Sequence, residues 1–294
     1  MTGLLIRGYR PADRAALLAL AAAALPAEPM PAERLDALAG AAGPDGLLLG
    51  WAAAELAGFV LASAGAGGDG WLTALGVAPG FRGHGHGRAL VAAAIARLRD
   101  AGCRQVRTGG PGEAYLVPGV DPAAYPAAAR LLDAAGFRET GSAQGMARDL
   151  SRPIPPPRST PGICYRPPAP AELPALTAMI AGQLSPSWAA LVAQAAPERL
   201  LVAFSGPAPV GFAASDVYAG CPGRFGPTGV AGDYRGQGIG RGLLDRTLLI
   251  MRAGGHPRAW FLWGPEGAAG QAMYRSAGFV ADRTFRLLSL DLVD

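Results

Sequence analysis

The pattern of apolar and polar positions predicts an alternation of strands and helices that runs through the chain twice. Short apolar runs predict strands, and longer stretches with an apolar residue every three or four positions predict helices. In the first half, we expect strands at 4–8, 46–64 (a hairpin), 71–77, 104–108 and 137–149 (a pair), and helices at 11–24, 84–101 and 123–135. In the second half, we expect strands at 163–166, 199–218 (a hairpin), 225–230, 258–263 and 279–292 (a pair), and helices at 170–184, 237–253 and 267–277. Such an order indicates an α/β (α+β) fold in which each half has a central mixed sheet flanked by helices.

The two halves also resemble each other in sequence. The segment GVAPGFRGHGHGRALVAAAIARLRDAG (76–102) aligns with GVAGDYRGQGIGRGLLDRTLLIMRAGG (229–255), and LLDAAGFRETG (131–141) aligns with MYRSAGFVADR (273–283). Upstream, IRGYRPADRAALLAL pairs with YRPPAPAELPALTAM. Three matches in the same order indicate duplication of a whole domain. We therefore predict an N-terminal domain at 1–150, a semi-rigid proline-rich linker at 151–161, and a C-terminal domain at 162–294.

Composition and charge narrow the chemistry. All 26 basic residues are arginine, which excludes a lysine nucleophile, a lysine Schiff base and a phosphate loop that ends in Gly-Lys. The net charge of +4 mildly favours anionic ligands, but the arginines are dispersed, so we expect no nucleic-acid partner. The cysteines stand far apart, at 103, 164 and 221. They indicate neither a disulfide framework nor a zinc site, and a reducing cytoplasmic location is the simplest interpretation.

The N-terminus imitates a signal peptide, because three arginines precede the apolar run AALLALAAAALPA. A similar pattern recurs inside the chain at 164–180, where no signal could act, so both are predicted to be a strand followed by a helix. The apolar run of 13 residues is also too short to cross a bilayer, and no membrane partner is expected.

A glycine-rich turn follows a predicted strand and opens a predicted helix in both copies. Glycine tolerates positive φ and lets backbone approach a ligand closely, and the first amides of a helix attract phosphate oxygens. The dinucleotide fingerprint G-x-G-x-x-G fails in both copies. What remains is Arg-x-x-Gly-x-Gly at 82–87 and at 235–240, which predicts a pyrophosphate cradle. His84 and His86 form a His-x-His pair that could ligate metal, but Gln237 and Ile239 replace them in the second copy. We therefore expect no metal; contact of either histidine with a phosphate is a weaker alternative.

These turns resemble those of the GCN5-related N-acetyltransferase (GNAT) superfamily. The resemblance rests on Val77-Ala78-Pro79 and Val230-Ala231-Gly232, on the two turns, and on the late Ala-Gly-Phe segments at 135–137 and 277–279. It covers both halves and implies a tandem member that binds acetyl-CoA as cosubstrate. The implied cofactor-binding residues are Val77, Arg82, Gly83, His84, Gly85, His86, Gly87 and Arg88 in the first copy, and Val230, Arg235, Gly236, Gln237, Gly238, Ile239, Gly240 and Arg241 in the second.

The resemblance also implies an acid four residues before the glycine of Gly-Phe, where a tyrosine commonly protonates the departing thiolate. That residue is Tyr274 in the second copy and Leu132 in the first, which cannot donate a proton. Departures from the pattern are Gly267 and Tyr125, where an asparagine is often found, and an insertion at 109–126. Either Tyr115 or Tyr125 could replace the missing acid. Candidates for a general base are Glu266, Asp216 and Asp233 in the second half and Glu113 in the first, although a surface charge is the plainer interpretation of each.

We therefore expect an acetyl-CoA-dependent N-acetyltransferase that acts on the amine of a small molecule or peptide by direct attack. The C-terminal half, with Tyr274, is expected to carry the chemistry, while the N-terminal half supports the fold, shapes the substrate site or binds acyl-CoA itself. Alternatives are a non-catalytic acyl-CoA-binding module and an acyltransferase with another donor or acceptor. The protein is expected to be a monomer with a pseudo-dimeric domain pair or a homodimer.

Overall fold

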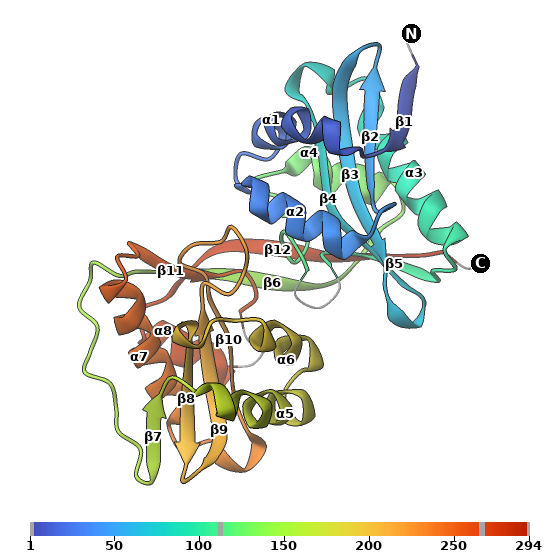
Figure 1. Cartoon of the computed structure of the whole chain (residues 1–294). Helices are drawn as coiled ribbons and strands as arrows, with labels where there is room; N and C mark the ends of the chain where they lie inside the picture. Colours follow the sequence, from blue (N-terminus) through green and yellow to red (C-terminus); the bar gives the residue numbers. More distant parts are fainter. Residues whose placement is uncertain (1–2, 111–113, 265–267, 293–294) are drawn as a thin grey trace. The chain divides into compact units, whose positions relative to one another are not determined.

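A computed structural model describes residues 3–110, 114–264 and 268–292 and divides them into two compact units. Unit 1 comprises residues 1–143 and 283–294, and unit 2 comprises residues 144–282. Each unit is built from a twisted sheet with helices on both faces (Figure 1). The predicted α/β class with two tandem domains is confirmed.

Unit 1 begins with the antiparallel strands β1 to β4, and β4 then pairs in parallel with β5. Residues 289–291 of β12 pair with the other edge of β5, and β6 follows β12 in the sheet order. The strands are β1 (Leu4–Gly8), β2 (Leu47–Ala52), β3 (Glu55–Ala64), β4 (Asp69–Val77), β5 (Gln105–Thr108), β6 (Arg138–Asp149) and β12 (Val280–Asp291). The helices are α1 (Arg14–Ala24), α2 (Ala32–Ala42), α3 (His86–Asp100) and α4 (Pro126–Ala134).

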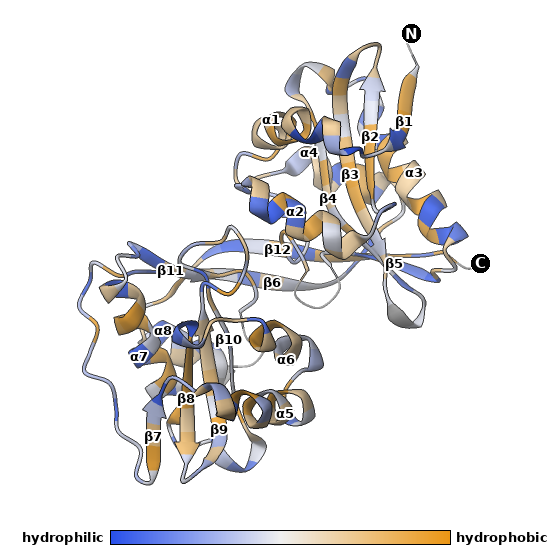
Figure 2. Cartoon of the chain, viewed as in Figure 1, coloured by the Kyte–Doolittle hydropathy of each residue, from blue (hydrophilic) through white to orange (hydrophobic). Residues whose placement is uncertain are grey.

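The nearly continuous apolar runs of β2 and β3 are explained by burial on both faces of the sheet, because successive side chains point to opposite sides. Leu47 and Leu49 pack in one cluster with α1 and α2, whereas Leu48 packs in another with α3 and α4. Figure 2 shows apolar residues along these strands and polar residues on the outer surfaces of α2 and α3. The sheet therefore separates two cores within unit 1.

Unit 2 repeats this plan. One sheet has the order β10-β9-β8-β7, and β11 pairs with the part of β6 that belongs to this unit. The strands are β7 (Ile163–Arg166), β8 (Leu200–Ser205), β9 (Ala208–Ser215), β10 (Phe225–Val230) and β11 (Arg258–Phe261). The helices are α5 (Leu173–Gln183), α6 (Pro186–Ala193), α7 (Ile239–Ala253) and α8 (Ala268–Ser276). Helices α5 and α6 cover one face of the sheet, and α7 covers the other.

The start of each repeat is fixed by the same ion pair. In unit 1, Arg7 contacts Asp13 at 2.7 Å, and Asp13 also accepts a hydrogen bond from the backbone N–H of Arg10 at 2.8 Å. In unit 2, Arg166 contacts Glu172 at 2.6 Å, and this guanidinium lowers the pKa of Glu172 to about 2. The pair joins the first strand of each unit to the start of its first helix.

The compact units do not coincide with the sequence repeats, because the final strands are exchanged. Residues 144–149 of β6, which end the first repeat, belong to unit 2, and residues 283–291 of β12, which end the second repeat, belong to unit 1. Ser289, Leu290 and Asp291 lie opposite Arg107, Val106 and Gln105 in β5. The proline-rich stretch at 151–161 also lies within unit 2, where Ile154 is buried in the core.

Most predicted elements are present within two residues of their expected bounds, and three expectations need correction. Residues 137–149 and 279–292 each form one continuous strand where a strand pair is predicted, because both lie within the ladder of neighbouring strands. Helices α2 and α6 lie where no element is predicted. None of the helices in the described ranges combines the length and apolar character needed to span a bilayer.

Because the final strand of the chain lies in unit 1, we predict that a core mutation in this strand destabilises unit 1. Leu288 is 1% exposed and packs in the cluster beneath α3, so Leu288→Ala should lower the free energy of unfolding by about 2–5 kcal/mol. Urea denaturation gives the size of the loss, and amide hydrogen exchange locates it. We expect faster exchange in α3, and Val280→Ala, at an exposed position of the same strand, serves as the control. Faster exchange confined to α7 would contradict the exchange of strands.

Candidate active site

A cavity of about 660 Å³ opens in unit 1 where two parallel strands diverge. Strands β4 and β5 are paired only from Asp69 and Gln105 as far as Leu72 and Thr108. Beyond that point β4 continues alone beside β3, and a bulge at Thr73 shifts its register. The cavity is lined by 72–77 of β4, by the turn and first residues of α3, and by the segments at 24–28, 108–109, 116–121 and 124–132.

The backbone of β4 is available on the side of this cavity. The N–H of Ala78 donates to the carbonyl of Ala57, which places Ala78 and Gly76 in hydrogen-bonded pairs with β3. Because antiparallel pairing alternates, Leu75 and Val77 direct their backbone polar groups away from β3. Both residues line the cavity. The carbonyl of Val77 accepts from Arg82, so the strand offers an extended ligand the backbone groups of Leu75 and the N–H of Val77 inside a largely apolar slot.

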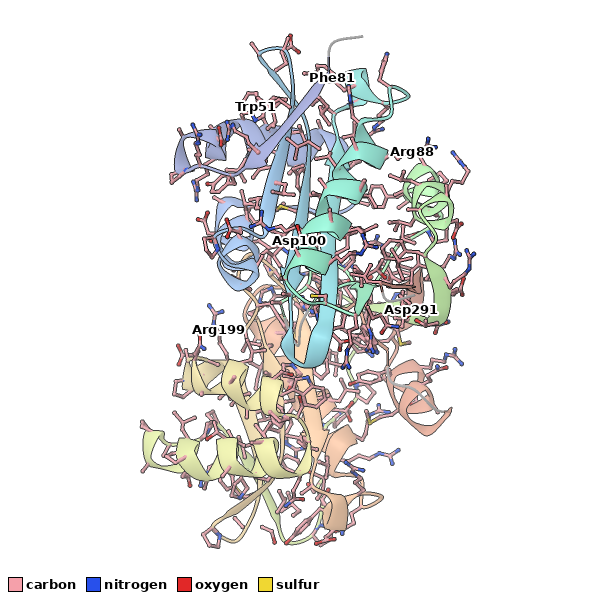
Figure 3. All side chains as sticks on the ribbon, turned by 90° about the vertical axis from the view of Figure 1, so that its right-hand side faces the viewer. Trp51, Phe81, Arg88, Asp100, Arg199 and Asp291 are labelled. Carbon is pink, nitrogen blue, oxygen red and sulfur yellow. The ribbon has the colours of Figure 1, made fainter. Side chains whose placement is uncertain are left out.

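The glycine-rich turn closes one end of the cavity. Gly83 and Gly85 have φ values of 81° and 82°, and α3 begins at His86, so the amides of its first turn lack intrahelical partners. Arg88 lies in this first turn, and Figure 3 shows it near Phe81, with Asp100 at the opposite end of the helix. Within the described ranges Arg88 has no ion-pair partner, and it lines the cavity. This end of the cavity is suited to a phosphate group.

The turn in unit 2 has the same backbone, with φ values of 77° at Gly236 and 82° at Gly238. Its charge differs. Arg241 donates to Asp245 at 2.7 and 2.9 Å and to the hydroxyl of Ser276 at 2.7 Å. The position equivalent to Asp245 in the first copy is Ala92. The arginine after the turn is therefore neutralised in unit 2 and uncompensated in unit 1.

Several of the residues predicted to bind cofactor have structural contacts of their own. The Nε of Arg82 donates to the carbonyl of Val77 at 3.1 Å, and Arg235 donates to Val230 at the same distance. These arginines fasten each turn to the strand before it. Ile239 is 1% exposed, so only its backbone can face a ligand, and Gln237 donates to the carbonyl of Asp233 at 3.2 Å.

The two histidines of the first turn differ in exposure. His86 is half-buried and lines the cavity. His84 is exposed, and its ring stacks on the ring of His86 with centroids 6.0 Å apart. No group of three or more potential metal-ligating His, Cys, Asp and Glu residues occurs in the described parts of the chain.

Tyr125 lies at the start of α4, on the wall of the cavity. Its hydroxyl accepts a hydrogen bond from the backbone N–H of Ala27 at 3.0 Å, which leaves its own proton available to a ligand. Burial, with a smaller contribution from the charge of Glu28, raises the pKa of Tyr125 to about 12. The phenol therefore stays protonated throughout the physiological range.

Two buried carboxylates share the cavity wall with Tyr125. Glu28 is 4% exposed and Asp121 is 5% exposed, and both line the cavity. Arg283 contacts Glu28 at 2.5 Å and Asp121 at 2.8 Å. Burial raises the pKa of Glu28, and the guanidinium of Arg283 opposes that shift only in part. Sequence analysis did not predict this cluster, because Glu28, Asp121 and Arg283 lie far apart along the chain and no motif joins them.

Tyr274 has a different setting. It is 6% exposed and packs among Phe225, Phe261 and Phe279, with ring centroids 4.7–6.1 Å apart. Burial raises its pKa. Its counterpart Leu132 is 3% exposed and lines the cavity of unit 1. The role predicted for Tyr274 as an acid stays a prediction.

The remaining candidates contribute little. Asp216 bonds to His256 at 2.7 Å and to the N–H of Gly223 at 2.6 Å, which identifies it as part of a turn, and Asp233 is exposed. Tyr115 is half-buried and is not among the residues that line the cavity. Glu113, Glu266 and Gly267 lie outside the described residues.

Comparisons with known proteins cover both halves. Residues 16–110 match the profile of the acetyltransferase (GNAT) family, and residues 196–281 match that of the acetyltransferase (GNAT) domain. The mycothiol acetyltransferase of Thermobispora bispora is 30% identical in an alignment of 304 positions that covers 92% of this chain and 93% of the relative.

Two solved structures share the fold of the whole chain. A GCN5-related glucosamine N-acetyltransferase region of a fungal multi-domain β-N-acetylglucosaminidase superposes with a TM-score of 0.81 at 18% identity. The alignment covers 99% of this chain and only 38% of that much longer one. A tandem GNAT protein of the clavulanic acid biosynthesis pathway has a TM-score of 0.74 at 18% identity, with 99% of each chain covered.

The repeated turn, the diverging strands and the extent of the match to an acetyltransferase agree with one another. The chain belongs to the GNAT acetyltransferase family, and it is an acyltransferase with two GNAT domains in tandem.

Proposed function

We propose that the protein is an acetyl-CoA-dependent N-acetyltransferase, that the cavity of unit 1 binds the acetyl-CoA, and that acetyl transfer takes place there. The observation that carries this proposal is the cavity between the diverging strands β4 and β5, which ends at the first turn of α3. The acceptor is the amine of a small molecule or peptide.

The lining of the cavity supports binding of this donor. The amides at the start of α3 and the uncompensated Arg88 would contact the pyrophosphate. The apolar slot along β4 would take the pantetheine arm, whose amides can bond to the backbone groups of Leu75 and to the N–H of Val77. A volume of about 660 Å³ is in the usual range for small-molecule sites.

Acetyl transfer would follow from holding the acceptor amine next to the thioester carbonyl. The amine nitrogen attacks the thioester carbonyl, a backbone N–H of β4 polarises the carbonyl oxygen, and the carbon–sulfur bond breaks to release a thiolate. Tyr125, protonated and lining the cavity, is the group in unit 1 that would donate a hydrogen bond or a proton to that thiolate. This proposal gives unit 1 the role that sequence analysis predicts for unit 2.

The named relatives suggest acceptors to try first. One relative is a mycothiol acetyltransferase, and one structural neighbour is a glucosamine N-acetyltransferase region. A primary amine carried by a small polar molecule is therefore the acceptor class we propose, and glucosamine is a practical starting substrate.

The location of the donor site is tested by a matched pair of glycine variants. Gly85 and Gly238 have the same φ of 82°, and an alanine there costs about 1–2 kcal/mol of backbone strain. We expect Gly85→Ala to displace the turn and to weaken acetyl-CoA binding about tenfold or more, as measured by titration calorimetry. Gly238→Ala should leave that binding event in place. The opposite result would move the donor site to unit 2.

The proton donor is tested by a pair of tyrosine variants. Tyr125→Phe should lower kcat for acetylation of glucosamine about 10²-fold or more, because the thiolate loses its hydrogen-bond donor. Tyr274→Phe removes only a hydroxyl from an aromatic cluster and should change kcat much less. Thiol release from acetyl-CoA gives the rates. A large loss in Tyr274→Phe alone would restore the catalytic role to the C-terminal half, and mass spectrometry of the product identifies the acylated atom.

A further inference from the structure

We propose that Glu28 accepts the proton of the acceptor amine in the unit 1 cavity, and that Arg283, from the last strand of the chain, is the positioning residue that aims it. This inference rests on the proposed function and adds to it the base, the device that holds the base, and a restriction on the acceptor.

Glu28 is buried and yet opens onto the cavity. It lies in the connection between α1 and α2 and is 4% exposed, yet it lines the cavity. The same cavity is lined by the Tyr125 hydroxyl and by the free edge of β4. A carboxylate that is shielded from bulk water and opens onto a substrate cavity has the setting of a general base.

Arg283 holds both Glu28 and Asp121. Its Nη1 and Nη2 donate to the two oxygens of Glu28 at 3.1 and 2.5 Å, and its Nε donates to Asp121 at 2.8 Å. Asp121 in turn accepts from the backbone N–H groups of Ala123 and Ala124. The fork of the guanidinium therefore fixes the plane of the Glu28 carboxylate, and each of its oxygens keeps a lone pair for a ligand.

The charges around Glu28 come from three elements. Besides Arg283 on β12 and Asp121 in the insertion, Arg34 on α2 acts on it, and the guanidinium of Arg34 is held by the carbonyls of Pro29 and Leu116. Two carboxylates and two guanidiniums carry no net charge. Only the carboxylates line the cavity, so a ligand meets hydrogen-bond acceptors in surroundings that are neutral overall. Because burial outweighs the guanidiniums, the pKa of Glu28 lies above its ordinary value, closer to the pKa of a working base.

The transfer balances with Glu28 in this role. An acceptor that enters as R–NH₃⁺ gives one proton to the Glu28 carboxylate, and the neutral amine attacks the thioester carbon. The tetrahedral intermediate loses its second N–H proton as the carbon–sulfur bond breaks, and one proton ends on the thiolate through Tyr125. The products are the amide, CoA with a free thiol, and a proton that Glu28 returns to solvent.

The same lining restricts the acceptor. A carboxylate or phosphate next to the amine would face the acceptor oxygens of Glu28 and Asp121, whose guanidinium partners do not line the cavity, and an anion buried there without a hydrogen-bond donor is strongly unfavourable. The acceptor class is therefore a primary amine without a neighbouring anionic group. We expect alaninamide to be acetylated with a kcat/KM at least tenfold higher than that of alanine, and glucosamine to exceed glucosamine 6-phosphate.

The role of Glu28 is tested by its amide variant and by pH. Glu28→Gln retains the volume and one hydrogen bond to Arg283, and it should lower kcat about 10²–10⁴-fold and remove the acid limb of the kcat profile. Glu33→Gln, on the exposed surface of α2, should match the wild type. The kcat profile is measured with two acceptors whose amines differ in pKa. An acid limb that reports an enzyme group lies at the same pH for both acceptors, whereas one that reports the amine moves with the pKa of the amine. A Glu28→Gln enzyme with an unchanged rate and profile would overturn the inference.

The role of Arg283 has its own readout. Loss of the guanidinium raises the pKa of a buried carboxyl, so in Arg283→Gln the acid limb should move to higher pH, and Arg283→Lys should restore part of the shift. A variant that is merely destabilised would lose rate without moving the limb, and that result would overturn the positioning role.

Failure of the inference can be separated from failure of the proposed function. Acetyl-CoA binding is measured by calorimetry on every variant, and Glu28→Gln should retain this binding because the first turn of α3 and Arg88, which are proposed to hold the pyrophosphate, are unchanged. A wild-type protein that binds acetyl-CoA and acetylates none of these amines would contradict the proposed function. If the wild type is active and Glu28→Gln has the same rate and pH profile, the inference alone is contradicted.

Discussion

The site depends on one constraint, which is that buried backbone amides and carbonyls must find hydrogen-bond partners. Strand β4 satisfies this along its whole length on the side of β3, but on its other side β5 accompanies it only as far as Leu72. Beyond Leu72, the backbone groups of Leu75 and the N–H of Val77 face a cavity, where water or a ligand must supply their hydrogen bonds, while the Val77 carbonyl accepts from Arg82. An extended ligand rich in amides can replace the missing strand, and this explains why the fold places a binding slot between two strands of its own sheet.

The exchange of final strands makes the cavity of unit 1 depend on both ends of the chain. Residues 283–291 complete the sheet beside β5, and the first of them supplies the guanidinium that holds Glu28 and Asp121. Burying such a cluster is costly unless every charge is paired, so the pairing by Arg283 is a condition for the carboxylates to lie there at all. Strand exchange therefore has a chemical consequence as well as a topological one.

Much of the fold could be predicted from sequence, because the repeat supplied two examples of each pattern. The glycine-rich turns, the strands before them and the helices after them depend on local preferences that the sequence displays directly. Helices α2 and α6 were missed because a proline stands at or immediately before the first residue of each and neither has a strong apolar pattern of its own. Strand exchange was missed because a strand has the same pattern whichever sheet it joins, and an alignment of repeats assigns it to its own copy.

The site could be predicted only where local sequence determines it. The turn carries its chemistry in the backbone, so glycine spacing was sufficient. Arg283, Asp121 and Glu28 come together only through the exchanged strand and the insertion, and no single motif contains all three. The comparison of the two copies weighted Tyr274 against Leu132, and the sequence does not show that Tyr274 packs among three phenylalanines.

The asymmetry between the copies has a physical origin in a few substitutions on a shared backbone. Both turns have the same φ values, so their amides are equally presented. Asp245 replaces Ala92 and draws Arg241 away from any ligand, whereas Arg88 retains its full charge. In the same unit as Arg88, the insertion contributes Asp121 and Tyr125 to the cavity wall. Duplication thus retained the backbone of the turn in both copies, and the two copies differ in the charge next to the turn and in one loop that adds polar groups to the cavity of unit 1.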